Sequence, residues 1–143
     1  MIATQSDRLH ATTVAIDGVA VMIEGVSGSG KSDLALRLID RGATLVSDDQ
    51  TLVVRSGEIL LARAPTTIVG RIEVRGIGII AVPYVGDVPV GLVVRVDSPV
   101  ERMPERRLRT IVGIDVRQVA VDPFEASAPI KIELAVRNPE PLE

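Results

Sequence analysis

The chain of 143 residues has no cysteine and no tryptophan, and its aromatic side chains are those of Tyr84 and Phe124. The absence of cysteine excludes a disulfide framework, a thiolate metal site and a cysteine nucleophile. The shortage of aromatic rings argues against a stacking platform for single-stranded nucleic acid. No apolar run approaches the ~18 residues of a membrane-spanning helix, and the N-terminus has no signal-like apolar segment. We therefore expect a soluble cytoplasmic protein that has an aliphatic core and binds neither nucleic acid nor a membrane.

The charge balance is slightly acidic, with a formal net charge of −3 and a pI near 5.2. This balance argues against a general binder of phosphate backbones, which needs a strongly basic surface. Apolar residues make up 46% of the chain and charged residues 24%, proportions that suit a packed core rather than disorder. The length suits a single domain, which we expect to span residues 1–143 with a frayed tail at 138–143.

The first third of the chain predicts a hairpin, a glycine-rich loop, a helix and a strand. Asp17-Gly18 between two apolar runs predicts a hairpin over 12–24. Apolar residues recur at helical spacing over 31–41, and Gly42 follows as a helix stop. A short strand over 43–47 then leads into two aspartates.

The rest of the chain is predicted to be rich in strands. Ser56-Gly57 predicts the turn of a second hairpin, and a single glycine-punctuated strand that bends close to another group is expected over 71–82. The charged segment 100–110 contains a proline and predicts an exposed loop. Further strands are expected over 89–99, 111–121 and 130–138, and the last of these segments suits a short helix equally well.

The glycine-rich loop matches the phosphate-binding pattern G-x-x-x-x-G-K-S without a mismatch, through Gly25, Val26, Ser27, Gly28, Ser29, Gly30, Lys31 and Ser32. Glycines let backbone N–H groups turn toward an anion, and a helix start adds its positive dipole end. In this pattern Lys31 reaches the β- and γ-phosphates and Ser32 offers its hydroxyl to Mg²⁺. The alternative is a loop-to-helix turn with a chance lysine, but the strand before and the helix after favour a phosphate loop.

Four more residues are candidates for chemistry, each with an ordinary structural alternative. Asp48 and Asp49 follow Lys31 closely, so one carboxylate could join a metal shell while the other faces an incoming hydroxyl; a solvent-exposed turn or a helix cap fits equally well. Glu73 shares a predicted strand face with Arg71 and Arg75, and could be a solvated residue. His10, the one histidine, could be structural or simply exposed.

The order of these segments resembles the catalytic domain of the bacterial HPr kinase/phosphorylase family. The resemblance rests on "HATTVAIDGVAVMIEGVSGSGKSDLALRLIDRGATLVSDD" and "RIEVRGIGII", and it covers roughly residues 8 to 82 and more loosely residues up to 136. It implies an α/β fold with a P-loop core like that of phosphoenolpyruvate carboxykinase, a mixed or antiparallel sheet and few helices. It also implies a Mg²⁺- and ATP-dependent kinase that phosphorylates a serine of HPr, the phosphocarrier of the sugar phosphotransferase system, and in many members a reverse phosphorolysis.

The resemblance also suggests a role for each candidate residue. Lys31 would be catalytic, Ser32 and Glu73 would bind the metal, and Asp49 would accept the serine proton with the support of Asp48. His10 aligns with a histidine of the family's active site. The family further uses an arginine of a mobile loop, for which Arg102 is the best match and Arg106 and Arg107 are alternatives. A loop arginine can neutralise charge on the transferring phosphoryl group.

Longer family members carry an additional N-terminal domain and C-terminal helices and assemble as hexamers, so the chain resembles a short single-domain form for which a homo-oligomer is expected. Two other functions compete with the HPr kinase. One is an ATP-binding regulatory module of a phosphotransferase or two-component signalling pathway that transfers little phosphate. The other is a P-loop kinase for a small molecule, which the fold alone permits. The P-loop lysine, a candidate base and a metal carboxylate together favour the protein kinase.

Overall fold

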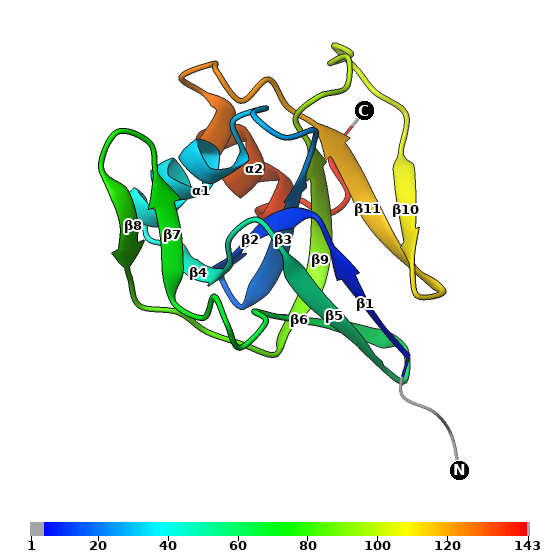
Figure 1. Cartoon of the computed structure of the whole chain (residues 1–143). Helices are drawn as coiled ribbons and strands as arrows, with labels where there is room; N and C mark the ends of the chain where they lie inside the picture. Colours follow the sequence, from blue (N-terminus) through cyan, green and yellow to red (C-terminus); the bar gives the residue numbers. More distant parts are fainter. Residues whose placement is uncertain (1–4, 143) are drawn as a thin grey trace.

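The computed structural model describes residues 5–142, over which strands follow one another with only two helical interruptions (Figure 1). The elements, in chain order, are β1 Ser6–Leu9, β2 Ala11–Ile16, β3 Val19–Glu24, α1 Lys31–Asp40, β4 Thr44–Ser47, β5 Thr51–Ser56, β6 Ile59–Arg63, β7 Arg71–Val74, β8 Gly78–Ala81, β9 Val88–Arg95, β10 Arg107–Ile111, β11 Ile114–Ala120 and α2 Ala128–Arg137.

The elements with strong local signals form where the sequence predicts them. β2 and β3 pair antiparallel around Asp17-Gly18, whose φ angles of 51° and 78° suit a tight hairpin turn. Helix α1 begins at Lys31, and Gly42 follows it with φ 113°, a left-handed conformation that glycine adopts without a steric penalty. β5 and β6 form the second predicted hairpin.

Three predictions over the second half of the chain are wrong or incomplete. The segment 71–82 is a hairpin rather than one strand, because Gly76 and Gly78 have φ angles of 85° and 125° and turn the chain between β7 and β8. Arg75 therefore lies in the turn and not on the strand face of Glu73. The predicted strand 111–121 is divided by a turn at Val112-Gly113.

The end of the chain departs from the predictions in two further places. The loop expected over 100–110 ends early, because β10 begins at Arg107. The ambiguous segment 130–138 belongs to helix α2, which has Pro129 in its first turn. Proline suits this position because the first backbone N–H groups of a helix have no partner within it.

The sheet is mixed, and the phosphate-loop strand lies inside it. The order of hydrogen-bonded strands is β1-β5-β6-β9-β3-β2-β4. β6 pairs with the first residues of β9, and β11 pairs with its last residues. β3 is parallel to β9 and β9 is parallel to β11, while β2 is antiparallel to both β3 and β4. The carboxyl ends of β3, β9 and β11 therefore lie at one edge of the sheet, where α/β proteins place their ligands.

The side chains of the central strands alternate between two apolar layers. Val21 and Ile23 of β3 pack with Leu34 and Leu38 of α1 in the larger core, which α2 completes. Met22 points to the opposite face and packs with residues of β5, β6, β10 and β11. The curled sheet thus covers one of its own faces, and the helices cover the other (Figure 1). The predicted fold class, a mixed α/β fold with few helices, is confirmed. Over residues 5–142, neither helix has the length and apolar character needed to cross a membrane.

Candidate active site

The phosphate loop begins at the end of β3 and leads into α1, and three of its positions require glycine. A Cβ atom at Gly25 would lie 2.7 Å from both the Ser29 Oγ and a methyl of Val96, so a larger residue does not fit there. Gly28 and Gly30 have φ angles of 80° and 95°. These left-handed conformations orient the backbone N–H groups of the loop in the way that an anion-binding concavity requires.

Lys31 is the first residue of α1, and its side chain folds back over the loop. Its Nζ donates hydrogen bonds to the carbonyl oxygens of Gly25 at 2.9 Å and Val26 at 3.0 Å. The residue is only 7% exposed, so its positive charge lies at the centre of the loop. The Ser29 Oγ is buried beside it with no hydrogen-bond partner among residues 5–142. A buried charge and an unpaired hydroxyl fit a loop that binds a polar anion.

Asp48 joins three parts of the fold through its carboxylate, which is nearly buried. The Ser32 hydroxyl donates to Oδ1 at 2.6 Å, and the buried Thr12 hydroxyl donates to the same oxygen at 3.1 Å. The backbone N–H of Glu73 donates to Oδ2 at 2.9 Å. Asp48 therefore fixes the start of α1, strand β2 and the β7–β8 hairpin around one carboxylate.

Asp49 adopts a strained backbone conformation directly after Asp48. Its φ is 68°, and the Gln50 N–H donates to the Asp48 carbonyl at 2.7 Å, which makes a three-residue γ-turn of the rarer positive-φ form. The Asp49 N–H donates to the Thr12 Oγ1 at 3.1 Å and helps to hold this turn. The exposed Asp49 carboxylate lies 3.3 Å from Nε2 of His10.

The phosphate loop, Asp49 and Glu73 line one cavity of about 470 Å³. Its wall also contains Asp33 and Leu36 of α1 and Arg75 from the turn of the β7–β8 hairpin. The structure thus brings together Lys31, Ser32, Asp49 and Glu73, as the sequence predicts. Asp48 does not line the cavity itself but holds Ser32 at its wall.

The residues around this cavity fit a magnesium-bound nucleotide. Carboxylate and hydroxyl oxygens are the ligands that Mg²⁺ prefers, and Ser32 and Glu73 supply them at the cavity wall. Across residues 5–142 no three His, Asp or Glu side chains form a metal cage of their own. Mg²⁺ usually binds through one or two carboxylates and keeps several ligand positions for waters and phosphates, so this arrangement suits it.

Comparison with known proteins identifies the family. Residues 2–88 match the HPr Serine kinase C-terminal domain. The chain belongs to this family. Its sequence is 36% identical to the HPr kinase/phosphorylase of Variovorax paradoxus (strain S110), over 91% of this chain and 46% of that relative. The HPr kinase/phosphorylase of Clostridium beijerinckii is 47% identical over 75 residues, which are 52% of this chain and 25% of that relative.

A solved structure agrees with this assignment over nearly the whole fold. The Hpr(Ser) kinase/phosphatase from Coxiella burnetii matches with a TM-score of 0.80 and 34% identity, over 92% of this chain and 95% of that one. The chain nevertheless spans only about half the length, or less, of the relatives compared by sequence. The resemblance to the HPr kinase/phosphorylase family that the motifs indicate is thus confirmed.

The arginines expected to serve this family's loop lie away from the cavity wall. Arg102 is exposed on the loop between β9 and β10, and neither it nor Arg106 or Arg107 lines the cavity. Arg106 donates to the Pro139 carbonyl, and Arg107 pairs with Glu101 at 3.1 Å. The catalytic role of Arg102 stays a prediction. Arg75, for which the sequence predicts no catalytic role, lines the wall instead.

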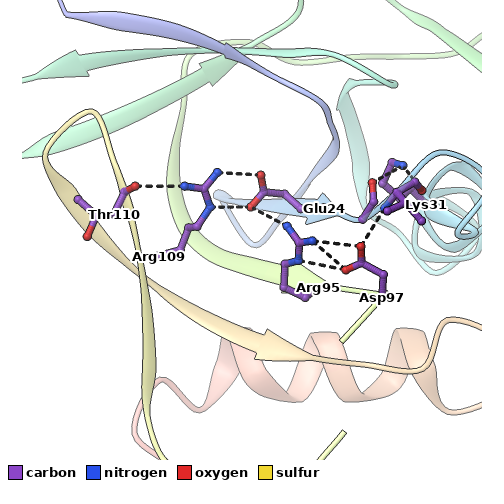
Figure 2. A network of polar contacts seen from close by, with 8 residues as sticks. Glu24, Lys31, Arg95, Asp97, Arg109 and Thr110 are labelled. Atoms are coloured by element: carbon purple, nitrogen blue, oxygen red, sulfur yellow. Dashed lines mark hydrogen bonds and ion pairs between the residues drawn. The ribbon is translucent and has the colours of Figure 1, made fainter. Parts of the chain in front are cut away.

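A second group of charged residues, Glu24, Arg95, Asp97 and Arg109, contacts the start of the phosphate loop (Figure 2). Its members are not among the site residues predicted from the sequence. Asp97 accepts a hydrogen bond from the Val26 N–H at 3.0 Å, and Arg95 donates to both carboxylate oxygens of Asp97. The buried Glu24 carboxylate accepts two hydrogen bonds from Arg109, at 3.0 and 3.1 Å, and lies 4.0 Å from Arg95.

These contacts shift the pKa values of two members of the group. Burial raises the pKa of Asp97, but hydrogen bonds from Arg95 and Val26 and the charge of Arg95 outweigh it, so the pKa lies below the ordinary 3.8. The hydrogen bond to Glu24 raises the pKa of Arg109 further, against the effect of its burial. The parallel pairing of β3 with β9 places Arg95 opposite Glu24, a signal that exists only once this register is known.

Proposed function

We propose that the chain is a Mg²⁺- and ATP-dependent protein kinase that phosphorylates a serine of HPr. The observation that supports this proposal is the 2.6 Å contact between Ser32 and Asp48, within a complete phosphate loop whose cavity also exposes Asp49. A nucleotide-binding site and a free carboxylate at the same cavity are the two parts that transfer to an alcohol requires.

Each residue has a role in this reaction that follows from its position. The loop N–H groups and the Lys31 ammonium bind the phosphates and balance their charge. Ser32 and Glu73 would bind the magnesium ion, and Asp48 orients the Ser32 hydroxyl. Bound Mg-ATP would supply the phosphoryl group, and the metal would neutralise charge that develops on the phosphates during transfer.

Asp49 is the proposed general base, and His10 positions it. The incoming serine hydroxyl gives its proton to the Asp49 carboxylate as its oxygen bonds to phosphorus and the bond to ADP breaks. The His10 imidazole, 3.3 Å away, fixes the orientation of this carboxylate. In the reverse reaction Asp49 returns the proton to the serine oxygen, and inorganic phosphate takes the phosphoryl group as pyrophosphate. Several relatives are named kinase/phosphorylase, which supports both directions.

Purified protein with Mg-ATP and HPr provides the decisive assay. We expect mass spectrometry to show one added phosphoryl group on a serine of HPr, and no addition with Lys31→Ala. ATP binding without any transfer to HPr would contradict the kinase and favour an ATP-binding regulatory module. Phosphoserine-HPr with inorganic phosphate, followed by pyrophosphate release, tests the reverse reaction. We expect this chemistry in the cytoplasm; a homo-oligomer stays a prediction that sedimentation velocity would check.

A further inference from the structure

Phe124 exposes an aromatic ring next to the phosphate loop. The chain has one phenylalanine, one tyrosine and no tryptophan, and Phe124 is 78% exposed. It lies on the turn between β11 and α2, and the catalytic roles proposed above do not use it. A ligand that covers the ring would bury this apolar area favourably.

The backbone that carries this ring is fixed by hydrogen bonds. Arg37 of α1 donates to the carbonyl oxygens of Pro123 and Glu125 and also pairs with Asp33. The Phe124 N–H donates to the Asp122 carboxylate at 3.0 Å. The turn is therefore tied to the helix that begins at the phosphate loop, so the backbone that carries the exposed ring has a defined position.

That position is the end of the phosphate loop. A Cβ atom at Gly30 would lie 3.4 Å from Cε1 and 3.5 Å from Cζ of the ring, so the edge of the ring contacts the space above the loop's last glycine. The topology explains this proximity, because β11 and β3 are both parallel to β9 and their carboxyl ends share one edge of the sheet (Figure 1). Gly30 also lines the cavity described above, so the ring flanks the rim of that cavity.

We propose that Phe124 binds the base of the nucleotide by stacking against its flat face. This inference rests on the proposed function, in which the phosphates lie in loop 25–32. A phosphate loop alone binds any polyphosphate, whereas an adjacent aromatic ring adds affinity for the purine. The ring offers no hydrogen-bond donor or acceptor, so it distinguishes a nucleotide from inorganic polyphosphate but not adenine from guanine.

Binding of Mg-ATP and of Mg-tripolyphosphate, measured by calorimetry on the same preparations, tests the proposal. We expect Phe124→Ala to weaken the binding of ATP roughly 5- to 150-fold, which is the effect of losing one stacked ring, and to leave the binding of tripolyphosphate unchanged. Phe124→Leu keeps an apolar side chain without a π-face and should resemble the alanine variant. Leu134→Ala, which truncates an exposed apolar residue of α2, is the matched control and should bind both ligands as the parent does.

A spectroscopic measurement gives a second readout that does not depend on activity. Because the chain has no tryptophan, Phe124→Trp introduces a single indole, and ATP but not tripolyphosphate should quench its fluorescence. Parental ATP affinity in Phe124→Ala would overturn the stacking role and leave the kinase intact. Parental ATP affinity together with a raised KM for HPr would show that the ring contacts the protein substrate instead. A parent that binds neither ligand would overturn the proposed function itself.

Discussion

The Ser32 hydroxyl donates a 2.6 Å hydrogen bond to the carboxylate of Asp48, which joins the start of α1 to the end of β4. The two residues are 16 positions apart, and strand β2 lies between β3 and β4 in the sheet. After one helix and one strand, the chain thus comes back into contact with the end of the phosphate loop. Asp48 also accepts hydrogen bonds from Thr12 and from the Glu73 backbone, and Thr12 in turn accepts from the Asp49 N–H, so a change in the charge of Asp48 affects the residues that hold Asp49 and Glu73.

Asp48→Asn should raise the magnesium concentration for half-maximal transfer roughly 10- to 100-fold, as loss of a group that orients a metal ligand does. The amide keeps the size of the side chain but loses the negative charge that accepts from Ser32. Kinetic titration with Mg²⁺ at saturating ATP measures the effect. Asp40→Asn makes the same exchange at the exposed far end of α1 and serves as the control. Equal magnesium requirements in the two variants would contradict the role of Asp48.

Glu73→Ala should also raise the magnesium requirement, for a different reason. The hydrogen bond from residue 73 to Asp48 comes from the backbone N–H and survives the substitution, so the hairpin stays docked. What is lost is the carboxylate at the cavity wall. We expect a higher magnesium concentration for half-maximal transfer in kinetic titration, with an unchanged melting temperature. A magnesium requirement equal to that of the parent would rule out Glu73 as a ligand.

Asp49→Asn should reduce the rate of transfer to HPr about 10²- to 10⁴-fold, the usual contribution of a general base. Asparagine is a better test than alanine because Asp49 has a φ of 68°, a conformation that Asn tolerates and that other side chains rarely adopt. Single-turnover transfer at saturating Mg-ATP isolates the chemical step. ATP affinity should stay close to that of the parent, and a near-parental rate would show that another group takes the proton.

The sequence predicts the first half of this site well because its signals are local. A turn dipeptide, eight consecutive loop residues and a helical period define β2 through β4, and the two aspartates come directly after the last of these strands. The sequence pattern around Gly76 and Gly78 suits bends within one strand, but their positive φ angles turn the chain, and Gly78 is the first residue of β8. Pro129 was the overlooked signal for helix α2.

The support behind the loop could not be predicted from local patterns. Asp97 contacts Val26 across 71 positions, and Arg109 contacts Glu24 across 85. Both contacts depend on the parallel register of β3 and β9 and on the order of strands beyond it. Arg102 is matched to the family's loop arginine by its neighbours in the sequence, and those neighbours do not give the distance of its side chain from the cavity.

Asp97→Asn should change the pH dependence of stability in acid. The folded-state pKa of Asp97 lies below 3.8, so the unfolded chain binds the proton more readily. Its stabilising effect is complete above pH 3.8 and is lost as the pH falls through the lower folded-state pKa. The parent should therefore lose more stability than the variant as the pH falls from about 3.8 toward the folded-state pKa. Urea unfolding of both proteins measured in steps from pH 5 down to pH 3 gives this difference, and parallel curves would contradict the ionised contact with Val26.

Arg109→Met should lower the free energy of unfolding by about 1–3 kcal/mol, because it leaves a nearly buried carboxylate without its two best donors. The Glu24 side chain is 6% exposed, and its other cation, Arg95, lies 4.0 Å away and is shared with Asp97. Methionine retains the apolar stem of arginine, so most of the loss reflects the missing hydrogen bonds. Urea denaturation at neutral pH measures it.

Arg107→Met provides the matched control on the same strand, because the pair of Arg107 with Glu101 is solvent-exposed on both sides. Exposed pairs contribute ~0–1 kcal/mol, so this variant should remain close to the parent. The double variant Glu24→Met, Arg109→Met removes both charges and should lose less stability than the two single variants added together, because no unpaired charge stays buried. Equal losses for Arg109→Met and Arg107→Met would show that the buried pair is no stronger than a surface one.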